Sequence, residues 1–391
     1  MSGTLNNIYS NVSFALHLHT EAIARLQEQA STGSRVNRAS DDPSNAHRIL
    51  GLNSQERSLE NYMYNISEVA STLEMSHDII LGNGGGGEGY GGIISALGKV
   101  KTLISQVTSG SYGEESRKQA AETVNSILEH VISLANTKRV NQYLFGGGDT
   151  ASAPYVAECT DGEITSVTYQ GSLEDRNIEV AAGVESSAFC VGDNIFRSDE
   201  RGTPVFVGDT GAAAGTGTSS VRGNIWLTVT EPVSGTYRLS IDGETSYVDV
   251  AVPPGNANTM VTHAETGEVL YVDTTEITSI GTDMVSVPGT HDIFNTLITL
   301  RGILRNEREL SEVQLQELRE NSLISLDEVS NLLVQSSVSI GAKIGFLENL
   351  KNSLENVKYN TEDEITRLEE ADIAQIAIGL SRREVLYQMS L

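Results

Sequence analysis

The chain has 391 residues, and its 52 acidic residues against 26 basic ones give a formal net charge of −26. So much negative charge would repel a phosphate backbone, which argues against nucleic acid as a partner. The length allows roughly two to three domains, and no apolar run is long enough to span a bilayer, so membrane insertion is not expected.

The first expected element is a long amphipathic helix. After Leu5 and Ile8, a heptad-like stripe continues at alternating steps of four and three through Val12, Ala15, His19, Ala22 and Leu26. These steps place the residues on one stripe of a helix, and such a stripe needs a partner helix. The first thirty residues lack the basic region and apolar run of a secretory signal peptide, so none is expected.

Residues 31–44 are expected to break the chain between two helices. Gly33 allows the left-handed backbone of a helix C-terminal cap. Asp42 followed by Pro43 fits an N-cap with proline at the first helical position. The second helix is therefore expected to begin at residue 43.

Two arginines, Arg35 and Arg38, lie inside this break. Their guanidinium groups can each hold a carboxylate through two hydrogen bonds. The partner is expected to be either Asp41 or Asp42 in the same turn or a carboxylate on another chain, and the sequence leaves both open.

After the break, apolar residues return at a spacing of seven, at Leu52, Leu59, Ile66, Leu73 and Ile80. A seven-residue repeat of this length predicts a left-handed coiled coil or a helical bundle. The glycine-rich run at 82–92 lacks the preceding strand and the Gly-Lys-Ser/Thr ending of a phosphate loop, so it is expected to be a flexible connection. Two further helices are expected over roughly 93–109 and 114–136.

The middle of the chain alternates between apolar and polar residues, which is typical of strands. The expected strands cover residues 164–169, 177–180, 225–230, 236–241, 246–250 and 269–273. The pair Asp242-Gly243 predicts a hairpin turn. Residues 208–220, rich in Gly, Ala, Thr and Ser, are expected to be an exposed loop.

Helix is expected again from about His291 to the end of the chain. A ladder of four and three residues places four leucine and isoleucine side chains on one stripe, at Leu333, Ile340, Leu347 and Leu354. A last amphipathic segment after Thr361 carries Ile376, Leu380 and Tyr387. The two ends of the chain are therefore expected to be helices of the same kind.

Four stretches of the sequence resemble a known family. They are STGSRVNRASDDP at 31–43, YLFGG at 143–147 after Asn136, the set TYQG, RNIEV and VGDNIF between 168 and 196, and SIGAKIGFLEN at 339–349. With NYMYNI at 61–66 and EADIA at 370–374, they resemble the superfamily of bacterial flagellins and flagellar hook-associated proteins. The second and third stretches favour its hook–filament junction branch over filament flagellin. Family chains usually continue past Tyr387 with another apolar turn, whereas this chain stops at Leu391.

The periodicities and the resemblance together imply an α+β fold. Long terminal helices are expected to pair into a coiled-coil-like bundle, with the β-rich middle projecting outward. The expected domains are a terminal helical domain of residues 1–40 and 361–391, a helical bundle of 41–154 and 291–360, and a β-rich outer domain of 155–290. The outer domain is expected to divide into two near residues 198–222.

The resemblance implies a structural subunit of the bacterial flagellum that acts as a hook–filament junction protein and polymerises through its terminal helices. Its partners would be further copies of itself, the hook-side junction protein, flagellin and an export chaperone. It would leave the cell through type III export without a cleaved signal and function outside. Filament flagellin is one alternative. An alternative from another class of protein is an adhesin or glycan-binding module on a helical stalk, for which Trp226 could provide an aromatic surface.

No cofactor, metal or catalytic residue is expected, and the chain is not expected to be an enzyme. It contains no HExxH or GxSxG motif. Its only cysteines, Cys159 and Cys190, lack metal-site spacing, and a disulfide between them is not favoured. The expected functional residues instead pack helices or subunits: Leu5, Ile8, Val12, Ala22, Leu26, Arg35, Arg38, Asp41, Asp42, Leu52, Leu59, Ile66, Leu73, Leu333, Ile340, Leu347, Leu354, Ile376, Leu380 and Tyr387.

Overall fold

A computed structural model describes the backbone of residues 2–82, 91–109, 113–160 and 162–389. Side chains are described for residues 10–82, 91–107, 113–160 and 162–389. Most of the glycine-rich run at 82–92, which the sequence predicts to be a flexible connection, therefore lies outside the described residues.

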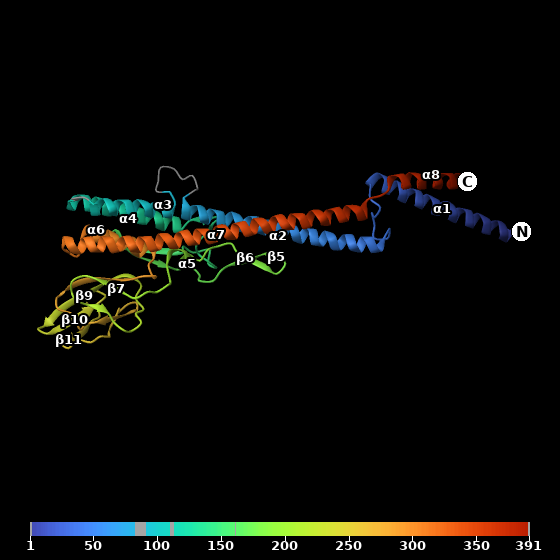
Figure 1. The fold of residues 1–391 in the computed structure, drawn as a ribbon. Helices are drawn as coiled ribbons and strands as arrows, with labels where there is room; N and C mark the ends of the chain where they lie inside the picture. The colour runs from blue at the N-terminus through green and yellow to red at the C-terminus, as the bar shows by residue number, and fades with distance from the viewer. Residues whose placement is uncertain (1, 83–90, 110–112, 161, 390–391) are drawn as a thin grey trace. The chain divides into compact units, whose positions relative to one another are not determined.

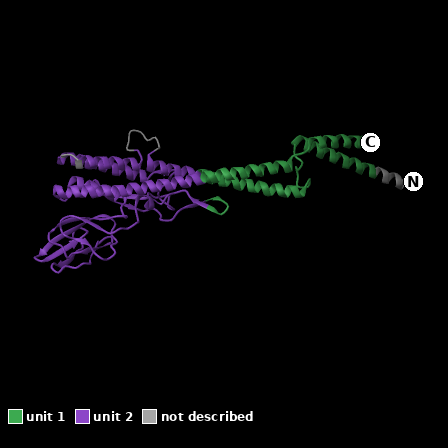
Figure 2. Cartoon of the chain, in the orientation of Figure 1, with its two compact units in different colours: residues 1–67, 179–184, 347–391 green, residues 68–178, 185–346 purple. Residues whose placement is uncertain are grey.

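The chain divides into two compact units (Figure 2). The terminal unit consists of residues 1–67, 179–184 and 347–391, and the central unit of residues 68–178 and 185–346. The three-domain division expected from the sequence is finer than this one and stays a prediction.

Apart from residues 179–184, which belong to a β-hairpin, the terminal unit is helical (Figure 1). It contains α1 (Ser2–Thr32), the first part of α2 (Pro43–Leu81), the last part of α7 (Glu312–Glu369) and α8 (Ile373–Met389). Helix α1 lies beside α8, and ion pairs of Arg48 with Glu364 and of Lys358 with Glu60 join α2 to α7. The long helices expected at both ends of the chain are confirmed.

The helices of the central unit pack through apolar faces. They include α3 (Ile93–Ser109), α4 (Glu114–Ala135), the short α5 (Gly192–Phe196) and α6 (Ile293–Arg305), together with the remaining parts of α2 and α7. Helix α4 contacts both α3 and α6. The side chains it buries recur at three- and four-residue steps: Ala120, Ala121, Val124, Ile127, Leu128, Val131 and Ala135.

Two antiparallel sheets follow α5 in the chain. A five-stranded sheet has the order β11-β10-β9-β14-β7, formed by β7 (Val205–Val207), β9 (Gly223–Val233), β10 (Thr236–Ser240), β11 (Val248–Ala251) and β14 (Gly281–Val287). A three-stranded sheet has the order β12-β13-β8, formed by β8 (Ala213–Ala214), β12 (Thr259–Thr262) and β13 (Val269–Asp273). Both contribute to one apolar core, which includes Leu227 and Leu239 from the first sheet and Val261 and Leu270 from the second.

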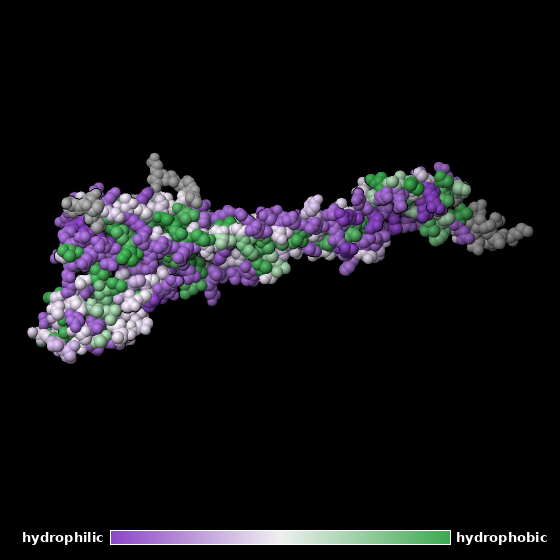
Figure 3. Space-filling view, in the orientation of Figure 1, coloured by the Kyte–Doolittle hydropathy of each residue, from purple (hydrophilic) through white to green (hydrophobic). Residues whose placement is uncertain are grey.

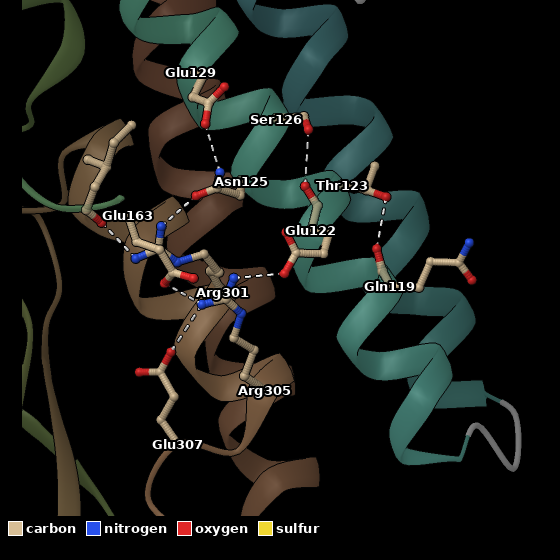
Figure 4. Close-up of polar contacts among 11 residues, drawn as sticks. Gln119, Glu122, Thr123, Asn125, Ser126, Glu129, Glu163, Arg301, Arg305 and Glu307 are labelled. Atoms are coloured by element: carbon tan, nitrogen blue, oxygen red, sulfur yellow. Dashed lines mark hydrogen bonds and ion pairs between the residues drawn. The ribbon is translucent and has the colours of Figure 1, made fainter. Parts of the chain in front are cut away.

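Three short hairpins complete the fold: β1 (Lys138–Arg139) with β2 (Gln142–Tyr143), β3 (Tyr155–Thr160) with β4 (Glu163–Tyr169), and β5 (Asn177–Ala181) with β6 (Val184–Ser187). The β3–β4 hairpin packs on α4 and α6. Figure 4 shows two arginines of α6 reaching this hairpin. Arg301 donates from Nη2 to the carbonyl oxygen of Ile164 at 2.6 Å, and Arg305 pairs with Glu163.

The stretches that resemble the junction branch meet in an aromatic cluster. Phe145 and Phe196 lie 5.1 Å apart between ring centroids, and Tyr155 lies 4.7 Å from Phe294 and 5.2 Å from Tyr169. A Cβ on Gly192 would come within 2.8 Å of the Phe145 carbonyl oxygen, so only glycine fits there without displacing the backbone. These stretches therefore build a core.

The structure confirms the α+β class, with helices at both ends and a β-rich middle, and it contains all six expected strands. The Asp242-Gly243 hairpin is confirmed because β10 pairs with β11. The expected exposed loop at 208–220 is wrong in part: Thr210 and Ser219 are buried, and β8 pairs with β13, since small polar side chains hydrogen-bond into the sheet. Cys159 and Cys190 are both free.

Asn136 joins the end of α4 to this cluster, and its removal is expected to destabilise the central unit. Its Nδ2 donates to the Tyr155 carbonyl oxygen at 2.8 Å, and its Oδ1 accepts from the Tyr155 backbone nitrogen at 3.0 Å. Asn136→Ala leaves two backbone groups of a buried residue unpaired, so we expect a loss of about 1–3 kcal/mol in the free energy of unfolding. Urea unfolding followed by the fluorescence of Trp226 measures it.

The matched control is Asn356→Ala, because the Asn356 side chain bonds only the Asn352 carbonyl on the exposed surface of α7. An equal loss in both variants would contradict the role given to Asn136.

Candidate subunit-packing surface

The break between α1 and α2 is built by local backbone chemistry. Gly33 has a φ of 69°, and its nitrogen donates to the Gln29 carbonyl oxygen at 2.9 Å, which ends α1. Asp42 caps α2, because its Oδ1 accepts from the Asn45 backbone nitrogen at 3.1 Å. The stop and the start predicted from the sequence are both confirmed.

This break pairs with the second break of the terminal unit, between α7 and α8. The Arg35 nitrogen donates to the Glu369 carbonyl oxygen at 2.6 Å, and the Ala371 nitrogen donates to the Gly33 carbonyl oxygen at 3.0 Å. Ser34 and Glu370 form the antiparallel bridge between them. Because α1 ends and α8 begins at this short ladder, the two helices run side by side in opposite directions (Figure 1).

The arginines of the break pair within the chain. Arg35 lies 3.8 Å from the Asp42 carboxylate and donates to the Leu368 carbonyl oxygen at 3.3 Å. Arg38 pairs with Glu28 at 3.1 Å, which is a partner the sequence analysis missed. Glu28 lies ten residues upstream on α1, and no local motif connects it to the break.

Asp41 and Asp42 have different roles. Asp41 accepts from the Arg38 backbone nitrogen at 2.9 Å and lies 3.3 Å from Arg25. The Asn45 backbone N–H, followed by the Asn45 side chain and the more distant Arg35 charge, holds the pKa of the Asp42 carboxyl below its ordinary value. Asp41 therefore fixes the turn, and ionised Asp42 fixes the start of α2.

The seam between α1 and α8 follows part of the predicted heptad stripe. Ala22 and Leu26 of α1 are half-buried, as are Leu380 and Tyr387 of α8, and Ile376 is buried. A Cβ on Gly379 would lie 3.4 Å from Leu26 Cδ1, in van der Waals contact, so position 379 faces α1 across the seam. This seam uses one stripe of each helix.

The remaining surface of both helices is exposed and partly apolar. Among the side chains described for α1, those of residues 10–32, none is buried, and in α8 only Ile376 is. Large apolar side chains are exposed on both: Val12, Phe14 and Leu18 on α1, and Ile373, Ile378, Val385, Leu386 and Met389 on α8. Figure 3 shows apolar side chains at the surface of these helices. We call this set the terminal apolar surface.

The other predicted packing residues lie elsewhere. In the terminal unit, Leu59, Ile66 and Leu347 are buried, while Leu52 and Leu354 are half-buried. In the central unit, Leu73, Leu333 and Ile340 are buried. The side chains of Leu5 and Ile8 lie outside the described ones. The α2 and α7 residues therefore fill the cores within one chain, and α1 with α8 is the candidate surface between chains.

Several residues of the terminal apolar surface were missing from the sequence-based set. Phe14 and Leu18 are 65% and 47% exposed, and they are spaced by one helical step of four residues. The four-residue spacing of Phe14 and Leu18 is visible in the sequence, but the longer heptad stripe was used to select the packing residues. A helix with two apolar stripes can contact one neighbour in its own chain and another outside it.

No helix within the described residues has both the length and the apolar character to cross a membrane. In the same ranges, no three His, Cys, Asp or Glu side chains are grouped as a metal site requires.

The helical N-terminal part of the chain is similar to a known protein family. Residues 5–150 match the family model described as the bacterial flagellin N-terminal helical region. The predicted resemblance to the superfamily of bacterial flagellins and flagellar hook-associated proteins is therefore confirmed.

Two individual relatives of the chain are also flagellar proteins. The flagellar hook-associated protein 3 of Escherichia coli strain K12 is 26% identical over 173 residues, which are 44% of this chain and 49% of that protein. The flagellar filament 30.7 kDa core protein of Treponema maltophilum is 24% identical over 186 residues, which are 46% of this chain and 56% of that protein. The chain spans about half the length of these curated relatives.

The fold is similar to that of a solved structure. The crystal structure of flagellar hook-associated protein-3 from Legionella pneumophila has a TM-score of 0.55 and 18% identity, over 82% of this chain and 98% of that chain. At this identity the likeness concerns the fold.

The position of Gly379 opposite Leu26 gives a test of the seam. Gly379→Leu places a side chain against Leu26, so we expect α1 and α8 to separate and the terminal helices to melt earlier than those of the wild type. Thermal unfolding followed by far-ultraviolet circular dichroism measures this. The control is Gly98→Leu in α3, where a Cβ has no neighbour within 4 Å; equal melting of the two variants would refute the seam.

The cap at Asp42 gives a pH-dependent test. Because the pKa of folded Asp42 is lowered, its stabilisation is complete above the unfolded pKa, near 3.9, and is lost as pH falls through the folded value. Asp42→Ala is therefore expected to be less stable than the wild type at neutral pH, with the difference vanishing in acid. Denaturant unfolding at a series of pH values measures this; a difference that stayed constant with pH would rule out the ionised cap.

Proposed function

We propose that the protein is a structural subunit of the bacterial flagellum that acts at the junction between hook and filament. The observation that carries this proposal is the terminal apolar surface, which a single chain leaves in water. Large apolar side chains exposed along two neighbouring helices favour association with another protein. Its relatives named flagellar hook-associated protein 3 support the junction role.

In this proposal the two helices act as one assembly element. The seam holds α1 against α8, and the exposed stripes of both, including Phe14 and Ile378, pack against the same element of neighbouring subunits. An isolated helix is marginal until it buries an apolar face. Assembly therefore adds burial where the monomer has little, and the β-rich middle is free to differ from that of other subunits.

The finer details of this role are inferred from the resemblance. The subunit would contact the hook-side junction protein on one side and flagellin on the other, and a chaperone would cover its terminal helices before export. It would pass through type III export without a cleaved signal and function outside the cell. The role needs no catalysis, so we propose that the protein is not an enzyme.

Filament flagellin is the second candidate, favoured by the match to a filament core protein. A filament subunit has to polymerise in long arrays of identical copies, whereas a junction subunit forms one short layer between two different partners. The two roles predict different products from the same purified chain.

Electron microscopy of the purified full chain at high concentration separates the two roles. We expect no long tubes, because a junction layer is limited by its partners. In the source bacterium, deletion of the gene is expected to leave hooks in place and release the filaments. Long tubes of this protein alone would support flagellin instead, and normal filaments on deletion strains would contradict both roles. Wild-type cells and cells complemented with the intact gene are the controls.

A further inference from the structure

Two arginines of the central unit share one carboxylate. Arg117 lies near the start of α4, and Arg319 lies near the start of α7. Glu312, the first residue of α7, pairs through Oε1 with Arg117 Nη1, and its Oε2 lies 3.9 Å from Arg319 Nη2. This cluster, which we call the arginine pair with Glu312, therefore holds two positive charges against one negative charge.

The burial of the two arginines makes their unbalanced charge costly. The side chains of Arg319 and Arg117 are 8% and 11% exposed, whereas that of Glu312 is 70% exposed. A charge removed from water is stabilised only by close ion pairs and hydrogen bonds. The 3.9 Å between Arg319 and Glu312 is too long for a hydrogen bond, and the Arg319 side chain forms none within the described residues.

The groups around Arg319 confirm that one carboxylate serves both arginines. Burial is the main cause that lowers the pKa of Arg319; the Glu312 carboxylate opposes this shift, and the positive charge of Arg117 adds to it. Glu114, the acid one turn before Arg117 on α4, pairs with Lys118 instead. The two guanidinium groups therefore lie close enough to repel each other, with Glu312 between them.

The unpaired guanidinium nitrogens can be reached from outside the protein. Of the nitrogens of Arg117 and Arg319 that lack a partner within the described residues, only the two Nε atoms are fully enclosed. Nη2 of Arg117 and both Nη atoms of Arg319 are thus unpaired and in contact with solvent. These N–H groups form part of the planar fork that matches the two oxygens of a carboxylate.

We propose that Arg117 and Arg319 receive a carboxylate from a second copy of this chain. A second carboxylate gives two acids against two arginines, whereas a phosphate dianion would leave surplus negative charge beside Glu312. Acids outnumber bases in the chain by 52 to 26, so the surface of another copy offers carboxylates to a positive site. Such complementarity selects the partner and fixes how it docks.

This contact belongs to the central unit and is additional to the terminal apolar surface. It rests on association between copies, as the proposed function does. The apolar side chains supply burial without direction, whereas a carboxylate held between two guanidinium groups specifies one orientation.

Sedimentation velocity of the full-length protein over a concentration series measures association between copies. Arg319→Met and Arg117→Met keep an apolar stem and remove the charge. Each is expected to weaken association at least about tenfold, because the entering carboxylate loses a charged partner. The melting temperature of monomeric Arg319→Met is expected not to fall, since the variant lacks a poorly paired buried charge. A fall in melting temperature with unchanged association would show a purely structural role.

Arg222→Met is the matched control, because Arg222 also belongs to the central unit and has a carboxylate of its own, Asp199, at 3.0 Å. All three variants lower the net charge equally, so any general change in repulsion between copies is the same for each. Sodium acetate adds a competition test. It is expected to weaken wild-type association more than sodium chloride of equal ionic strength, and this difference is expected to vanish in Arg319→Met.

Three results would each overturn the proposal: a wild-type protein that stays monomeric, equal association of Arg319→Met and Arg222→Met, or acetate that acts only as chloride does. Phe14→Asp, in the terminal apolar surface, separates this contact from the proposed function. A loss of association in Phe14→Asp with none in either arginine variant would rule out the carboxylate contact and leave the proposed function in place.

Discussion

The terminal unit depends on the backbone pairing of two chain breaks. Residues 33–35 and 369–371 are more than 330 positions apart in the sequence, yet they exchange hydrogen bonds as a short antiparallel ladder. The ladder includes Glu369, the last residue of α7, whose carbonyl oxygen accepts from the Arg35 nitrogen, so it satisfies a group that a helix end leaves unpaired. It also fixes the end of α1 beside the start of α8. Their pairing therefore follows from a backbone constraint, and the side-chain seam refines it.

Burial is distributed unequally along the helices that this ladder connects. In the terminal unit, Leu59, Ile66 and Leu347 are removed from water within one chain. The described side chains of α1 are at most half-buried, although the helix is 31 residues long. Because helices gain most of their stability from packing, α1 and α8 are the parts of the unit with most to gain from a second subunit.

The sequence was sufficient for the long helices and for six of the strands, but it missed β7, β12 and β14 and several of the contacts between elements. Heptad spacing identified the seams, and Gly33 with Asp42-Pro43 located the helix ends, because these signals are local and each has one physical cause. The pair of Arg38 with Glu28 and the aromatic cluster around Tyr155 required the fold, since their members come from separate segments. The loop at 208–220 was misread because a composition rich in small residues also suits a short strand whose hydroxyls bond within a sheet.

The distribution of charge along the chain agrees with an assembly surface on α1 and α8. The whole protein carries −26, and copies of so acidic a chain repel one another. The acidic and basic residues of α1 and α8 are nevertheless balanced, as Glu21, Glu28 and Glu384 against Arg25, Arg382 and Arg383. The surplus negative charge therefore lies outside the two helices that expose the terminal apolar surface. A helix pair without net charge can approach its own copy while the rest of the chain keeps the acidity that opposes unspecific association.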